Sequence, residues 1–120
     1  RALVAATQGQ AGLAGFAEAT GRAADSIAAA TDWLIAAAAG NPDEVNAAAV
    51  DFLHAFGLLA YAHMWLLMLQ ASAGKDDAFH ADKFKVGAFF FARLLPELDS
   101  RVASLRAGAD TLMALSEDSF

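Results

Sequence analysis

Three histidines, His54, His63 and His80, are the residues of this sequence that most invite a metal or haem site. His54 and His63 are nine residues apart, about 900° of rotation at ~100° per residue, so on one helix they point to opposite faces. His80 can reach Asp76 or Asp77 one turn back, but the Glu-x-x-His pairs of di-iron bundles are missing. The pattern favours hydrogen-bonded core or interface histidines, and we predict no metal site.

Other reactive side chains also lack the neighbours that catalysis requires. No serine lies in a Gly-x-Ser-x-Gly elbow or beside a suitably placed base. Glu97 and Asp99 follow Pro96 and are interpreted as surface charges rather than as a general base. The glycine-rich GQAGLAG stretch follows no strand and ends in no Gly-Lys-Ser/Thr, so it favours a loose helix start over a phosphate loop. We therefore predict no catalytic and no cofactor-binding residue in this chain.

Composition limits the class of protein. The 120 residues fit a single domain, and an alanine-rich sequence with two prolines favours long helices over strands. A net charge of −6 without a cluster of Lys and Arg argues against a nucleic-acid partner. The absence of cysteine excludes disulfide and thiolate chemistry and fits a cytoplasmic protein. The chain begins with Arg1, so we interpret it as the C-terminal fragment of a longer enzyme.

Periodicity and cap signals predict three long helices. The ranges expected are about Gln10–Ala39, Pro42–Ala73 and Asp77–Ala107. Asn41 followed by Pro42 and two acidic residues is a strong helix start, and the short loop before it forces the first two helices antiparallel. Pro96 removes a backbone hydrogen bond and should kink the third helix. The predicted fold class is therefore all-α: an antiparallel up-down-up bundle of three long helices.

The second predicted helix contains the most apolar stretch of the chain. From Phe52 to Gly74 there is no Asp, Glu, Lys or Arg, and the stretch is long enough to cross a bilayer. His54, His63 and Gln70 would be costly at membrane depth, and the flanking helices need an apolar partner. We therefore expect the central helix of a water-soluble bundle and no membrane span.

The third helix carries two apolar stripes. The main stripe runs through Phe91, which is predicted to lie in the core beside the Pro96 kink. Phe90 and Leu94 form a second stripe, which normally marks a contact surface. Trp65 and Met68 of the central helix add further apolar surface. We therefore predict a candidate interface that comprises Phe90, Leu94, Trp65 and Met68.

The C-terminal tail offers another explanation for the second stripe. Apolar side chains in the tail suggest that it docks on the bundle: Leu112, Met113, Leu115 and Phe120. The tail could then cover Phe90 and Leu94 in place of another domain or subunit. Composition cannot choose between these two partners, because both place apolar surface against apolar surface.

Three segments carry a resemblance to a known family. They are Ala30–Leu34 (ATDWL), Phe89–Glu97 (FFFARLLPE) and Arg106–Asp110 (RAGAD) with Leu112-Met113. In these segments, and over about residues 20 to 120, the chain resembles the C-terminal extension domain of bacterial acyl-CoA dehydrogenases. The branch that it resembles includes 3-methylmercaptopropionyl-CoA dehydrogenase-like enzymes.

The resemblance implies an FAD-dependent parent enzyme that introduces a 2,3-double bond into an acyl-CoA. In that family a Glu of the preceding helical domain takes the α-proton and the flavin takes the hydride. The extension follows that Glu, so no catalytic residue is carried onto any position here. FAD is expected in the parent enzyme and not in this chain.

Two functional hypotheses from different classes follow. The first is a non-catalytic assembly domain that contacts the upstream catalytic domains and a second subunit of an acyl-CoA dehydrogenase. The second is a free-standing helical module for protein interaction or ligand binding. The length of the open reading frame before Arg1 would separate them.

Overall fold

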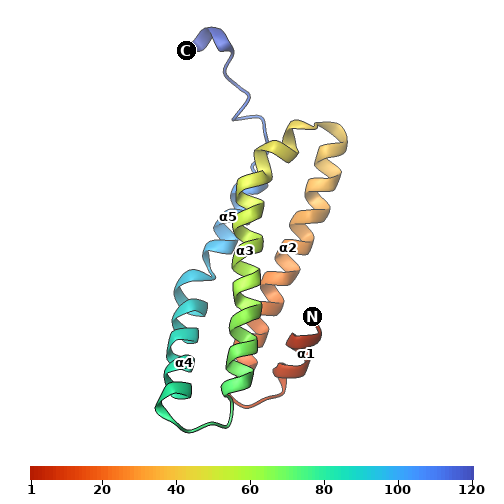
Figure 1. Cartoon of the computed structure of the whole chain (residues 1–120). Helices are drawn as coiled ribbons and strands as arrows, with labels where there is room; N and C mark the ends of the chain where they lie inside the picture. Colours follow the sequence, from red (N-terminus) through yellow and green to blue (C-terminus); the bar gives the residue numbers. More distant parts are fainter.

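The computed structural model describes residues 1–120, and the fold is all-α (Figure 1). Three long segments run antiparallel to their neighbours, as the sequence predicts. They are α2 (Ala14–Gly40), α3 (Asp43–Ser72), and the pair α4 (Ala78–Phe89) and α5 (Glu97–Leu105) with a π-helical turn η1 (Phe90–Leu94) between them. The all-α bundle is therefore confirmed, and its boundaries lie within a few residues of the expected ones.

Short polar turns connect the long helices and fix where they begin. Before α3, the Asp43 N–H donates to Oδ1 of Asn41 at 3.1 Å, so Asn41 caps the helix ahead of Pro42. Before α4, the His80 N–H donates to Oδ1 of Asp77, also at 3.1 Å. Each side chain satisfies a backbone donor that the first helical turn leaves without a partner.

A short helix, α1 (Ala2–Gln8), precedes the bundle and was not predicted. Seven residues are too few to be stable as an isolated helix, so tertiary packing must hold it. Thr7 is fully buried, and its hydroxyl donates to the Leu3 carbonyl at 2.8 Å. In Figure 1, α1 covers only the lower part of the face that α2 and α3 present.

Alanines line the core side of α3. Ala48, Ala55 and Ala62 recur every seven residues, and each is at most 1% exposed. They pack in one apolar cluster with Ala23, Ile27 and Ala30 of α2. Small side chains at these positions let the helices approach closely. The larger apolar residues of the cluster come from η1 and from the segment around α5: Phe90, Leu95, Leu98, Val102 and Leu105.

The main stripe of the third segment differs from the prediction before Pro96. Phe90 is buried, at 4% exposure, whereas Phe91 is half-buried and packs on Phe16 with the ring centroids 4.9 Å apart. The cause is the π-helical turn η1, in which the Leu95 N–H donates to the Phe90 carbonyl at 3.0 Å. One extra residue in the turn places Phe90, instead of Phe91, on the face that Leu95 and Leu98 continue.

The break itself lies at Pro96, as predicted. Leu95 and Pro96 keep right-handed helical dihedral angles, and α5 begins at Glu97. A π-turn directly before a proline relieves the missing N–H and offsets the rod without ending it. Figure 1 shows α5 displaced from the axis of α4 at this point.

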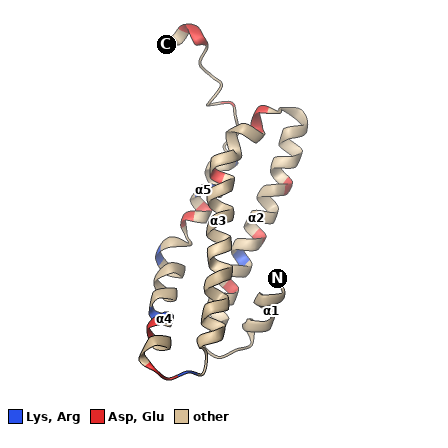
Figure 2. Cartoon of the chain, viewed as in Figure 1, with Lys and Arg blue, Asp and Glu red and all other residues tan.

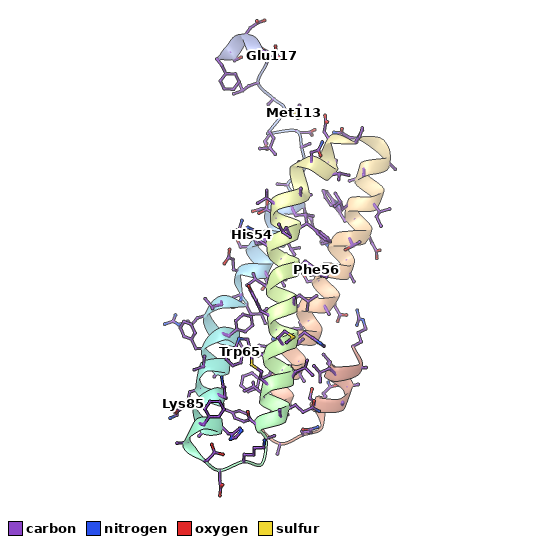
Figure 3. All side chains as sticks on the ribbon, in the orientation of Figure 1. His54, Phe56, Trp65, Lys85, Met113 and Glu117 are labelled. Carbon is purple, nitrogen blue, oxygen red and sulfur yellow. The ribbon has the colours of Figure 1, made fainter.

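The C-terminal tail does not dock, and this part of the prediction is wrong. All residues from Asp110 to Phe120 are exposed, including the short 3-10 helix η2 (Glu117–Ser119), and Phe120 is 96% exposed. Figure 3 shows the tail around Met113 and Glu117 leading away from the bundle. Gly108, at a φ of +83°, turns the chain outward after α5. Leu112 and Met113 line a groove with Asn46 and Ala47 of α3 but stay 67% and 64% exposed, so the tail does not cover the second stripe.

Candidate assembly surface

The four predicted interface residues do not form one exposed patch. Phe90 lies inside the bundle and stacks on half-buried Trp65 with the ring centroids 6.4 Å apart. Met68 is also half-buried, so only Leu94, at 44% exposure, lies on the surface. Neither the tail nor another chain is needed to cover Phe90, because the π-turn rotates this ring into the core of its own bundle.

A different apolar surface lies on the outer side of α3. It is opposite the buried alanines Ala48, Ala55 and Ala62, which we call the alanine seam. We define the outer stripe as eight positions of this helix: Asn46, Val50, Leu53, Gly57, Ala60, Met64, Leu67 and Ala71. Leu53 is 69% exposed and Met64 is 53% exposed, and every other member except the half-exposed Gly57 is also exposed. Large aliphatic side chains in such a row normally mark a contact surface.

The sequence held a signal for the outer stripe that our prediction missed. Its members are separated by spacings of 4, 3, 4, 3, 4, 3 and 4 residues, which keep one face of a helix. The signal was hidden because every face of this part of α3 is apolar. Only the positions of α2 and α5 show which apolar face is covered.

Two open grooves flank the outer stripe. The groove on the α5 side has a volume of about 400 Å³ and includes Leu53, Gly57 and Tyr61. The groove on the α1 side has a volume of about 340 Å³ and includes Phe56, Ala60 and Met64. Gly57 lines the first groove and Ala60 lines the second, so the ridge between the grooves is lowest at these small residues.

The outer stripe is also free of charge. Figure 2 shows that α3 carries acidic residues only in its upper part. Of these, Asp51 faces α5, where its Oδ1 accepts a hydrogen bond from Arg101 Nη1 at 3.1 Å. Glu97 Oε1 accepts two further hydrogen bonds from Arg101, and the two carboxylates raise the pKa of Arg101, Glu97 more than Asp51. Such a surface suits an apolar partner better than a charged one.

The histidines lie apart from one another. His54 and His63 are exposed on opposite flanks of α3, and Figure 3 shows His54 on the α5 side. His80 is half-buried, and its Nδ1 contacts Oδ2 of Asp77 at 2.5 Å. Mainly through its side-chain hydrogen bond, His80 lowers the pKa of Asp77 below 3.8. No three His, Asp or Glu side chains gather where they could hold a metal ion.

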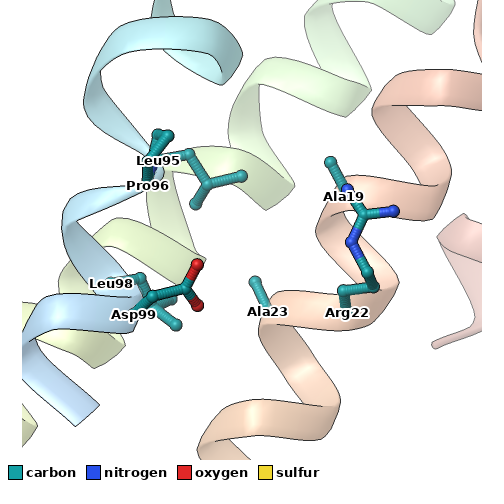
Figure 4. Close-up of a pocket in the computed structure, with 7 residues that line it drawn as sticks. All are labelled: Ala19, Arg22, Ala23, Leu95, Pro96, Leu98 and Asp99. Carbon is teal, nitrogen blue, oxygen red and sulfur yellow. The ribbon is translucent and has the colours of Figure 1, made fainter. Parts of the chain in front are cut away.

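A separate hollow lies beside the Pro96 break (Figure 4). Its volume of about 200 Å³ is below the range of roughly 300–1,000 Å³ that is typical of ligand pockets. Arg22 and Asp99 stand on its rim, and Arg22 is already paired with Glu18 at 2.7 Å. The hollow results from the offset of α5 and offers no set of groups for catalysis.

FAD does not fit the residues present. A diphosphate needs backbone or cationic donors. The groove on the α5 side is lined by the acidic Glu97, and Arg1 in the groove on the α1 side is already paired with Asp25 at 2.6 Å. The glycine-rich GQAGLAG segment lies in the turn between α1 and α2 and follows no strand. The flavin site of an acyl-CoA dehydrogenase would therefore have to be formed by other parts of that enzyme.

α3 also meets the length and composition requirements of a membrane-spanning helix. Of its most apolar 18-residue window, 22% is buried inside the bundle. One such helix is weak evidence for a membrane span; a core helix that passes the same test is mostly buried, whereas most of this window is not.

Comparison with known proteins gives one finding. The family model described as "Acetyl-CoA dehydrogenase C-terminal like" matches residues 1–116. No curated protein and no solved structure matches the chain. The predicted resemblance to a C-terminal domain of the acyl-CoA dehydrogenase type is therefore confirmed, and the 3-methylmercaptopropionyl-CoA dehydrogenase-like branch stays a prediction. With 116 of its 120 residues matched, this chain belongs to the acetyl-CoA dehydrogenase C-terminal-like family.

Proposed function

We propose that this chain is a non-catalytic assembly domain of an acyl-CoA dehydrogenase. The parent enzyme would use FAD to oxidise an acyl-CoA to a 2,3-enoyl-CoA, with the flavin and the catalytic base supplied by other domains. The partners of this domain would be those catalytic domains and a second subunit. Family membership supports the type of enzyme.

The size of the buried core supports a role that requires a partner. Only 20 of the 120 residues are buried. The accessible surface is 7438 Å², whereas a compact monomer of this mass exposes about 6,200 Å². The radius of gyration is 18.1 Å, against about 14 Å for a compact domain of this length. The chain therefore exposes more surface than an independent domain requires.

The outer stripe of α3 is the observation that carries the proposal. It is continuous over about 37 Å of helix at ~1.5 Å per residue and bears no charge. Apolar surface that contacts water costs about 25 cal/mol per Å², so covering Leu53, Met64 and Leu67 would stabilise an assembly. The alanine seam on the opposite side of α3 already holds the fold together, which leaves the outer stripe free for a partner.

The parent enzyme provides the test. Leu53→Glu would place a carboxylate at the centre of the contact, where burying an unpaired charge costs several kcal/mol. We expect this change to weaken subunit or domain assembly, measured by light scattering and limited proteolysis of the full-length enzyme. Ala29→Glu, at an exposed position of α2, is the matched control and should leave assembly unchanged.

The isolated chain separates assembly from folding. Leu53 is exposed, so Leu53→Glu should leave the helical circular dichroism of the chain unchanged. Normal assembly and proteolytic resistance of the full-length Leu53→Glu enzyme would refute the proposed role of this surface.

A further inference from the structure

We propose that the outer stripe is a two-fold interface, in which α3 of one chain packs antiparallel on α3 of a second copy. This inference rests on the proposed assembly function and names its partner. No other helix crosses the front of α3 in Figure 1, and every member of the outer stripe except half-exposed Gly57 is exposed. At the start of the stripe, Asn46 lines a groove together with Leu112 and Met113 of the tail. Two copies could therefore meet along the stripe, from Val50 to Ala71.

The spacing of the outer stripe is the same in both directions along the helix. A two-fold axis between Gly57 and Ala60 places each member opposite another member of the partner's stripe. Gly57 then faces Ala60, and Leu53 faces Met64. The outer pairs are Val50 with Leu67 and Asn46 with Ala71.

Side-chain size agrees with this pairing. The two central positions are small, and a Cβ on Gly57 would meet no heavy atom within 4 Å. Two backbones can therefore approach closely at the centre, where the ridge between the two grooves is lowest. Larger side chains on both sides of the centre, such as Leu53 and Met64, can then fill the partner's grooves.

Charge does not oppose the pairing. The antiparallel register places no charged residue between Asn46 and Ala71 against the partner's outer stripe, because Asp51 is turned towards Arg101. At each end, Asp43 falls beside Lys75 of the second copy, which has the opposite charge. A parallel arrangement would place the two Asp43 carboxylates together. It would also bring together the two helix N-termini, each of which is the positive end of a helix dipole.

The exposed area is sufficient for such a contact. The chain exposes about 1,200 Å² more than a compact monomer of its mass, although the tail contributes part of this excess. A stable interface buries about 800 Å² on each partner. The outer stripe and its two flanking grooves supply exposed apolar side chains for such a contact.

Gly57→Leu tests the interface without disturbing the fold. The new side chain extends into open space in the single chain, and leucine is a better helix former than glycine. In the dimer the same side chain would separate the two backbones at their closest point. We expect the dimer dissociation constant to rise roughly tenfold or more, measured by sedimentation equilibrium. Gly15→Leu, at another helical glycine with no atom within 4 Å of its Cβ, should leave it unchanged.

Spin labels test the orientation. The chain has no cysteine, so single Asn46→Cys and Ala71→Cys variants can be labelled at exposed positions. In the antiparallel dimer, labels at the same position lie about 37 Å apart along the helix, because 25 residues at ~1.5 Å separate positions 46 and 71. A mixed dimer with one label of each kind should give a much shorter distance.

Three outcomes would overturn the inference. They are a chain that stays monomeric at the highest soluble concentration, a Gly57→Leu dimer as tight as the parent, and short distances between labels at the same position. A monomeric chain whose Leu53→Glu variant still weakens the full-length enzyme would leave the proposed function standing and assign the outer stripe to the catalytic domains. A monomer that instead binds vesicles of neutral lipid would assign the stripe to a membrane.

Discussion

The Leu95 N–H donates to the Phe90 carbonyl at 3.0 Å, across five residues instead of four. This π-type bond belongs to the turn that sets which phenylalanine of the Phe89-Phe90-Phe91 run enters the core. Phe90 then stacks on Trp65, and Phe91 packs on Phe16. The first prediction follows from this arrangement.

Phe90→Ala should destabilise the chain by about 3–5 kcal/mol, because a buried ring is replaced by a cavity. Phe91→Ala should cost about 1–2 kcal/mol, because this ring is half-buried and loses mainly its contact with Phe16. Urea denaturation of the two variants measures both losses. A larger loss of stability for Phe91→Ala than for Phe90→Ala would mean that the turn between α4 and α5 lacks the extra residue.

Gly87 lies against Leu69, and this contact predicts the effect of an added methyl group. A Cβ at Gly87 would be 3.0 Å from Leu69 Cδ1, and Leu69 is fully buried. The crowding should outweigh the ~1 kcal/mol gain in helix propensity, so we expect Gly87→Ala to lower the free energy of unfolding by about 1 kcal/mol.

Gly57→Ala is the control for Gly87→Ala, because the space around Gly57 is open. It should raise the free energy of unfolding by up to ~1 kcal/mol when measured on the monomer. Equal stabilisation by both changes would show that Leu69 can move aside.

Removal of residues 110–120 should change the free energy of unfolding by less than about 0.5 kcal/mol, because every residue removed is exposed. Phe90→Glu should instead destabilise the chain strongly, because the carboxylate would be buried without a partner. Chemical denaturation compares the two variants directly. Similar large losses in both would restore the tail as the cover of Phe90.

The Asp77–His80 contact predicts a pH dependence. Because His80 lowers the pKa of Asp77, the contribution of this pair to stability is present above the unfolded value of 3.8. It is lost as the pH falls through the lower pKa of the folded state. Asp77→Asn should therefore lower the urea midpoint at neutral pH and have little effect in strong acid. A constant difference across the whole pH range would contradict this linkage.

The isolated chain should not form a stoichiometric yellow complex with FAD. Glu97 lines the groove on the α5 side, and Arg1 in the groove on the α1 side is paired with Asp25, so neither groove presents a free cationic cradle for a diphosphate. The visible spectrum of the purified chain after incubation with excess FAD and gel filtration measures any binding. A retained flavin spectrum at one equivalent would refute the expectation that other domains hold the cofactor.

The sequence by itself determined the three long helical segments, their approximate ends and their order, but not the short helix α1. Asn41, Asp77 and Pro96 act on backbone groups within one turn of themselves, so their effects can be predicted without knowing what packs nearby. The short loop before α3 likewise fixed the antiparallel direction. Family-specific segments were enough to identify the type of domain.

Only the tertiary structure decided which faces are buried. The π-turn lies directly before Pro96 and shifts the helical phase between α4 and α5. Pro96 predicts a break at this place, but it does not predict which phenylalanine ring enters the core. On α3 every face is apolar, so hydrophobic periodicity could not distinguish the alanine seam at Ala55 from the outer stripe at Leu53. The neighbouring helices made that distinction, because small alanines allow close approach and the larger aliphatic side chains are left facing outward.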